Sequence, residues 1–202
     1  MKRRAVLDVA ILDDHSFSYR APIWWGNLLM IFIEGTAFAL MIVAYYYIRR
    51  NFNTWPPERT YLPDLGVSTA NLILQLVSVA PMWYAAKLAF AHEPPERISR
   101  WLMLVVAFGL VAIVLRAFEL KGLHTRYDSN AYGSITWMLL ITHLAHLIAG
   151  SLETFLIALV LITGPVERKH YTDATVMAVY WYFVVGSWLA LWLVVFVSVR
   201  FI

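Results

Sequence analysis

Residues 131–163 read AYGSITWMLLITHLAHLIAGSLETFLIALVLIT, and this stretch decides the fold. Glu153 is the only Asp, Glu, Lys or Arg in it. A helix needs about 20 apolar residues to cross a hydrocarbon core, so this stretch is long enough to span a membrane. Four other stretches share its length and apolar character: 23–48, 68–91, 100–120 and 174–202.

The connections between these stretches carry residues that stop helices. They contain Trp55-Pro56-Pro57, then Pro94-Pro95, then Gly122, then Gly164-Pro165. Proline has no backbone donor and disfavours helix in the residue before it. The stretches do not alternate between apolar and polar residues, as strands of a membrane barrel would. The sequence therefore predicts an all-α, polytopic membrane bundle of about five transmembrane helices.

The composition supports a membrane location and excludes several functional classes. Apolar residues make up 61% of the chain and charged residues 14%, whereas soluble domains carry about a quarter charged residues. Too little polar surface is left to face water. The chain has no cysteine, which excludes disulfides and thiolate metal sites. Its Lys and Arg are dispersed between the apolar stretches, so we expect no nucleic acid partner.

The charges also suggest the domain organisation and the orientation. Residues 1–20 carry Lys2, Arg3 and Arg4, but acidic residues interrupt the apolar run that a signal peptide needs. We expect a retained polar tail at 1–20 and a transmembrane domain at 21–202. Eight Lys and Arg lie on the side of this tail and six on the other side. This bias favours a cytoplasmic N-terminus and an external C-terminus.

Glu34 is the clearest ionisable residue inside a predicted span. It lies near the middle of 23–48, and no cation stands three or four residues away on either side. Such a residue in a bilayer faces protein or water and is a functional candidate. Glu34 must be paired across helices or protonated. Two interpretations stay open: a carboxyl group that fixes helix packing, or a group that handles protons.

Two other sets of polar residues lie in the predicted spans. Arg116 and Glu119 share one helical face and can form an ion pair, which we place at the membrane interface. His143 and His146, with Glu153 seven residues later, lie close to one face of 131–163. They serve either structural hydrogen bonds or a metal or haem. The remaining histidines fall in the tail and the connections: His15, His92, His124 and His170.

The order of these features resembles cytochrome c oxidase subunit III, in its five-helix bacterial form. The matching motifs are Glu34 with Tyr45-Tyr46-Tyr47; Trp55-Pro56-Pro57; Asn71; Phe118-Glu119; Ala131-Tyr132-Gly133-Ser134; Thr142-His143-Leu144-Ala145-His146-Leu147-Ile148-Ala149-Gly150; and Tyr180-Trp181-Tyr182-Phe183-Val184-Val185 with Trp188. The resemblance covers roughly residues 23 to 202. Two positions depart from the pattern, because Tyr182 stands where the family has His and Val185 where it has Asp.

The resemblance implies a non-catalytic subunit of an aerobic respiratory complex in the bacterial inner (plasma) membrane. Such a subunit holds no redox cofactor or metal of its own. It lies with oxidase subunits I and II, of which subunit I carries haem and copper, and it binds phospholipid and supports proton uptake. By position, Glu34 matches the family's carbodiimide-reactive glutamate. Glu119, His143 and His146 match its polar positions on later helices.

Three alternatives remain open from the sequence. An accessory protein of nitric oxide reductase belongs to the same broad family and would tolerate the missing His and Asp. A membrane haem protein would use His143 or His146 as ligand. A small transporter would be active without any partner subunit.

Overall fold

A computed structural model describes residues 22–58 and 60–201, and this part of the chain is helical without strands. The helices are α1 (Pro22–Arg49), α2 (Leu65–Phe90), α3 (Pro95–Lys121), α4 (Ala131–Thr163) and α5 (Arg168–Trp192). All five are long and apolar enough to cross a membrane. The fifth candidate span runs from Arg168 to Arg200 and so extends beyond the end of α5. The predicted all-α membrane bundle is confirmed. The predicted tail, 1–20, lies outside the described residues.

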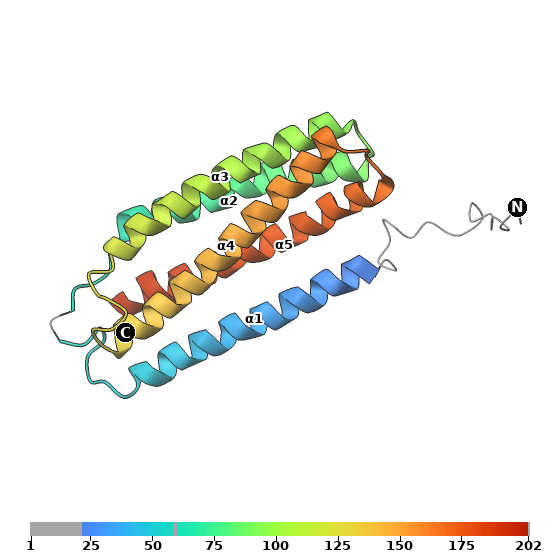
Figure 1. The fold of residues 1–202 in the computed structure, drawn as a ribbon. Coiled ribbons are helices and arrows are strands. Elements are labelled where there is room, and N and C mark those ends of the chain that lie inside the picture. Colours follow the sequence, from blue (N-terminus) through green and yellow to red (C-terminus); the bar gives the residue numbers. More distant parts are fainter. Residues whose placement is uncertain (1–21, 59, 202) are drawn as a thin grey trace, which may run out of the picture.

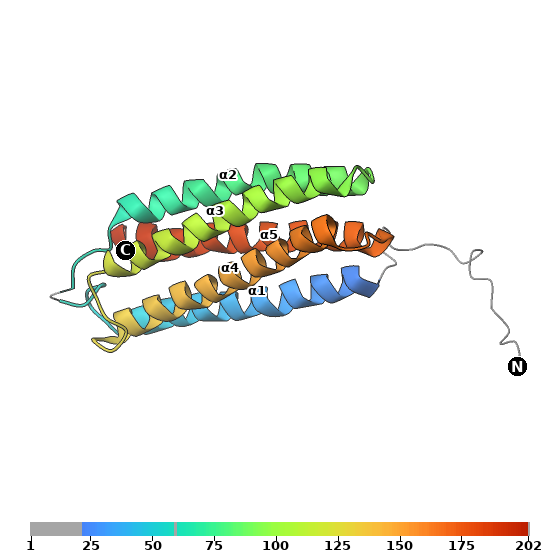
Figure 2. The same cartoon turned by 45° about the horizontal axis from the view of Figure 1, so that its top comes forward.

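The helices run side by side along one long axis (Figures 1 and 2). Helix α5 packs against α2 and α4, and α3 packs against α2 and α4. Helix α1 packs against α4 and α5, on the side of the bundle away from α2 and α3 (Figure 2). Large apolar side chains such as Phe32 and Phe90 stay exposed on the outside. Lipid would cover them, since helices with paired backbones can face hydrocarbon.

Two helices begin several residues before the apolar stretches predicted from the sequence. Helix α3 begins at Pro95 rather than residue 100, and α5 begins at Arg168 rather than residue 174. Pro95 occupies the first position of α3, where a missing backbone donor costs nothing. Glu167 and His170 form a reciprocal capping box at the start of α5. His170 therefore lies in α5 and not in a connection, because charged residues extend these helices beyond their apolar part.

The last predicted span, 174–202, also differs at its end. After Trp192 the chain continues in a π-helical turn, η1 (Leu193–Val197), and a 3₁₀ turn, η2 (Ser198–Arg200). The Arg200 guanidinium donates to the carbonyl oxygens of Phe196 and Pro63. This contact ties the end of the helix to the connection before α2.

The interior contains two apolar clusters, one toward each end of the bundle. The first includes Ala112 of α3, Leu147 of α4 and Val185 of α5, and the second includes Leu123, Leu140 and Trp188. Arg116 and His143 fall between these positions along α3 and α4. The most polar part of the interior therefore lies at the level where the two clusters meet.

Candidate functional site

Arg116 and Glu119 form an ion pair inside the bundle. The Nη1 atom of Arg116 lies 2.5 Å from Oε2 of Glu119, and both side chains are fully shielded from solvent. The predicted pairing is observed. Neighbouring helices cover both groups, so the pair is buried in protein; its predicted place at the level of the membrane interface stays a prediction.

Asn71 of α2 donates to the Glu119 carboxylate, and Gln75 of α2 donates to Asn71. Nδ2 of Asn71 donates to Oε1 of Glu119 over 2.7 Å, and Nε2 of Gln75 donates to Oδ1 of Asn71 over 3.2 Å. Removing two charges from water is costly unless further hydrogen bonds satisfy them. Asn71 supplies such a bond to Glu119 and links the pair to α2.

His143 accepts a hydrogen bond from the same arginine. Nη2 of Arg116 lies 3.0 Å from Nδ1 of His143, and Nε2 of His143 lies 3.0 Å from the carbonyl oxygen of Val184. A guanidinium only donates and a carbonyl only accepts. The network therefore assigns a neutral His143 with its proton on Nε2. Protein partners occupy both ring nitrogens, and this arrangement favours the structural interpretation of His143 over the metal-ligand one.

Trp188 lies under the guanidinium group. The Cζ atom of Arg116 is 3.6 Å from the centre of the Trp188 ring, and His143 is tilted against the same indole at 5.2 Å. An aromatic face attracts a cation more strongly where water is excluded. Helices α2 to α5 thus each contribute to one buried polar network, made of Asn71, Gln75, Arg116, Glu119, His143 and Trp188.

His146 belongs to a second site, on the side of α4 that faces α1. Its Nδ1 lies 2.7 Å from the carbonyl oxygen of Thr142, and its Nε2 lies 3.7 Å from Oε2 of Glu34. The ring of Phe38 lies 5.0 Å from that of His146 and 6.4 Å from that of His143. His143 and His146 thus serve different partners on neighbouring faces of α4.

The Glu34–His146 pair requires a proton to be favourable. Because Nδ1 of His146 donates to a carbonyl oxygen, Nε2 has no proton in the neutral ring and would face a carboxylate with its lone pair. The contact is attractive when one proton lies on His146 or on Glu34. The expectation that Glu34 is paired across helices or protonated is consistent with this geometry.

Tyr180 and Glu153 surround Glu34. Tyr180 of α5 is almost fully buried and interacts with the Glu34 carboxyl group, and Glu153 of α4 lies within electrostatic range of it. Glu153 and Tyr180 also line a cavity of about 340 Å³ with Asp173 of α5 and Asn27 of α1. Polar groups from three helices therefore gather along the α1 side of the bundle.

The family-motif tryptophans are packing residues with one polar bond each, apart from Trp188. Nε1 of Trp55 donates to the hydroxyl of Tyr45 over 2.8 Å, fixing the connection after α1. Nε1 of Trp181 donates to Oγ of Ser78 over 2.9 Å, linking α5 to α2. Val185 is buried in the first apolar cluster, and Tyr182 packs against it. Tyr182 and Val185 stand where the family has His and Asp. Here His143 of α4 donates to the backbone carbonyl oxygen of Val184 in α5 and so links the two helices.

Sequence reasoning missed Gln75 and Asn27 as parts of these sites, and it noted Asn71 without placing it. Asn27 of α1 donates to the carbonyl oxygen of Val176 of α5 over 3.3 Å. The available signal was the rarity of amides inside apolar spans, since a buried amide needs partners. Among the described residues, no three His, Asp or Glu side chains gather closely enough to hold a metal ion.

Comparison with known proteins decides the family. The family model for cytochrome c oxidase subunit III matches residues 2–199, nearly the whole chain. This chain belongs to the cytochrome c oxidase subunit III family. The resemblance seen in the sequence motifs is thereby confirmed. The subunit III family is part of an oxidase complex, so further subunits are implied.

Several relatives match this subunit III chain along most of their length. It is 24% identical to cytochrome c oxidase subunit 3 of Thermostichus vulcanus, over 95% of each chain. It is 28% identical to that of Corynebacterium diphtheriae, over 85% of each chain. It is 23% identical to that of Synechocystis, over 85% of this chain and 74% of the relative. Together with the five spans, these bacterial relatives identify a multi-pass membrane protein.

Proposed function

We propose that this chain is the non-catalytic subunit III of an oxygen-reducing haem-copper oxidase. It packs against subunits I and II, stabilises subunit I and supports its proton uptake, while haem and copper lie in subunit I. The Glu34–His146 pair is the observation that supports this role, because it places two titratable side chains within ion-pair distance, 3.7 Å, inside a membrane-spanning bundle.

The buried network has a structural part in this proposal. Arg116, Glu119 and His143 are buried and bonded to one another, so the network is inaccessible from the surface. It holds α2 to α5 in register, and α4 in turn presents His146 to Glu34. Phospholipid binds along the α1 side, where Ile23, Leu156 and Val176 line the cavity beside Glu153.

The orientation is part of the same proposal. We place the N-terminus in the cytoplasm of a bacterial inner membrane and the C-terminus outside. The α2–α3 and α4–α5 connections then face the cytoplasm, next to Arg97 and Arg100 at the start of α3 and Arg168 and Lys169 at the start of α5. This arrangement follows the excess of Lys and Arg in cytoplasmic connections.

Glu34→Gln in the purified complex tests the proton role. Gln keeps the shape of the side chain but cannot take up or release a proton as a carboxyl group does. We expect unchanged haem content, with slower proton uptake or earlier inactivation during turnover. Glu58→Gln, in the connection after α1, is the control and should behave as the parent. Loss of haem from the Glu34→Gln complex, or unaltered proton uptake and turnover lifetime, would contradict the proposal.

A further inference from the structure

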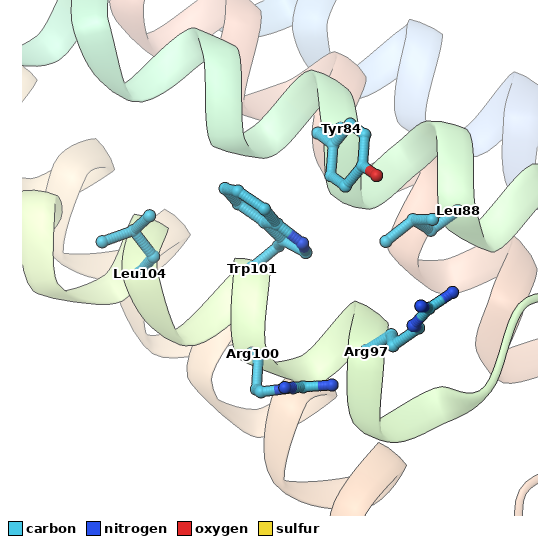
Figure 3. A pocket seen from close by; sticks show the side chains of 6 residues that line it. All are labelled: Tyr84, Leu88, Arg97, Arg100, Trp101 and Leu104. Atoms are coloured by element: carbon cyan, nitrogen blue, oxygen red, sulfur yellow. The ribbon is translucent and has the colours of Figure 1, made fainter.

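A surface pocket between α2 and α3 lies far from both polar sites. It has a volume of about 430 Å³ and is lined by Tyr84, Leu88, Arg97, Arg100, Trp101 and Leu104 (Figure 3). It lies where α2 ends and α3 begins. This volume is in the range of ligand sites in proteins, about 300–1,000 Å³. It accommodates a head group and the first part of an acyl chain rather than a whole lipid.

The lining residues change character along α3. Arg97, Trp101 and Leu104 are spaced by four and three residues, so they lie on one face of the helix. With a rise of 1.5 Å per residue, Trp101 lies about 6 Å and Leu104 about 10 Å deeper than Arg97. A cation, an aromatic ring and an aliphatic side chain therefore follow one another from the helix end toward the membrane centre. A lipid presents phosphate, glycerol and acyl chain in the same order.

Tyr84 and Trp101 form the aromatic wall of this pocket. Their rings meet at 4.8 Å in a T-shaped arrangement across α2 and α3. In Figure 3 the guanidinium group of Arg97 lies nearest Leu88, and the Arg100 side chain lies farther from the two rings. Tyr and Trp are enriched at the depth of lipid head groups. The aromatic pair thus marks the level at which the site meets the membrane surface.

The charges at the pocket leave room for an anion. Nη1 of Arg97 lies 3.1 Å from the Glu93 carboxylate, and Nε of Arg100 donates to the carbonyl oxygen of Glu96 over 3.3 Å. The Arg97–Glu93 pair is exposed, and such pairs are weak. Lys87 of α2, exposed and placed over Trp83, adds positive charge at the same end. Guanidinium groups bind phosphate oxygens with two parallel hydrogen bonds.

We propose that this pocket is a specific site for an anionic phospholipid, with its phosphate on Arg97 and Arg100 and an acyl chain over Trp101 and Leu104. The site lies on the face of α2 and α3, away from the cavity beside Glu153. It goes beyond the role proposed for the chain and does not depend on it. If no anionic lipid binds here, the proposed oxidase role is unaffected. If the chain purifies without oxidase subunits, the proposed lipid site is unaffected.

Photolabelling in vesicles tests the site. The full chain is placed in phosphatidylcholine vesicles containing either photoactivatable phosphatidylglycerol or equally labelled phosphatidylcholine. Each basic residue near a membrane surface contributes attraction to anionic lipid, so we expect phosphatidylglycerol to label residues 84–104 roughly tenfold more. The preference should fall to near one in the R97Q/R100Q double variant. It should persist in R97K/R100K, and in R126Q, which lies in the connection that follows α3.

Three results would overturn the proposal. Equal labelling by the two lipids would show ordinary boundary lipid. Loss of the preference on adding excess inorganic phosphate would show an anion site without lipid specificity. Cross-links from residues 84–104 to another subunit in the native complex, without lipid, would show a protein interface. Labelling of the other helices, measured in the same samples, shows whether R97Q/R100Q is folded.

Discussion

The guanidinium group of Arg116 stacks on Trp188 at 3.6 Å while it is paired with Glu119. Arg116 thereby links α3 to Trp188 of α5. Arg116 is fully buried between the two apolar clusters, so we expect its removal to lower stability.

Arg116→Met should destabilise the chain by about 3–5 kcal/mol, because it leaves the Glu119 carboxylate buried without its cation. The R116M/E119L double variant should recover most of this loss. Chemical unfolding in detergent micelles measures both. Arg126→Met, which removes an exposed pair with Asp128, is the control and should cost at most about 1 kcal/mol. Similar effects for Arg116 and Arg126 would contradict the structural role.

Gly109 allows the close approach of α3, α4 and α5. A Cβ atom there would lie 2.3 Å from Oγ of Ser151 and 3.3 Å from the Trp181 ring. Gly109→Ala should therefore cost about 1–3 kcal/mol through overpacking. Gly186→Ala, with no atom within 4 Å of the new Cβ, should be neutral or stabilising. Thermal unfolding compares the two. Adding Ser151→Ala to Gly109→Ala should restore part of the loss; no recovery would exclude this contact as the cause.

The Tyr45 hydroxyl accepts the indole hydrogen of Trp55. Tyr45→Phe would leave that buried donor without its acceptor, so we expect a loss of about 1–3 kcal/mol. Tyr47→Phe on the same helix changes an exposed side chain and should have little effect. Unfolding in detergent again gives the difference. Equal stabilities of these variants would show that the Trp55 bond does not hold the connection.

The proposed topology can be measured directly because the chain has no cysteine. A single cysteine at Glu93, between α2 and α3, should react with an impermeant thiol reagent only from the cytoplasmic side. One at Asp128, between α3 and α4, should react only from outside. The reverse pattern would invert the orientation, and labelling of both from one side would exclude a single crossing by α3.

The sequence predicted the five spans because each is a long, mostly apolar run that is bounded by charged residues, proline or glycine. It predicted the pairing of Arg116 with Glu119 because their spacing is local. It placed that pair at the membrane interface because Arg116 lies near the end of its span. Its burial depends on Trp188 and His143, which come from other helices, and one sequence does not give their register against α3.

The two histidines also show that a single sequence does not give the packing of one helix against another. Their spacing indicated a common face, but neighbouring helices divide them: His143 meets Arg116 of α3, and His146 meets Glu34 of α1. The helix starts at Pro95 and Arg168 were missed because hydropathy reports the hydrocarbon-spanning part of a helix. Capping and proline position decide where the helix itself begins.

Purification of the tagged chain from its native membrane, with identification of the bound proteins and a visible spectrum, tests the oxidase role most directly. We expect oxidase subunits I and II to copurify, with a haem spectrum that stays unchanged in His143→Ala complexes that remain assembled. Recovery of the chain alone with its own haem, or bound to a nitric oxide reductase, would contradict the account.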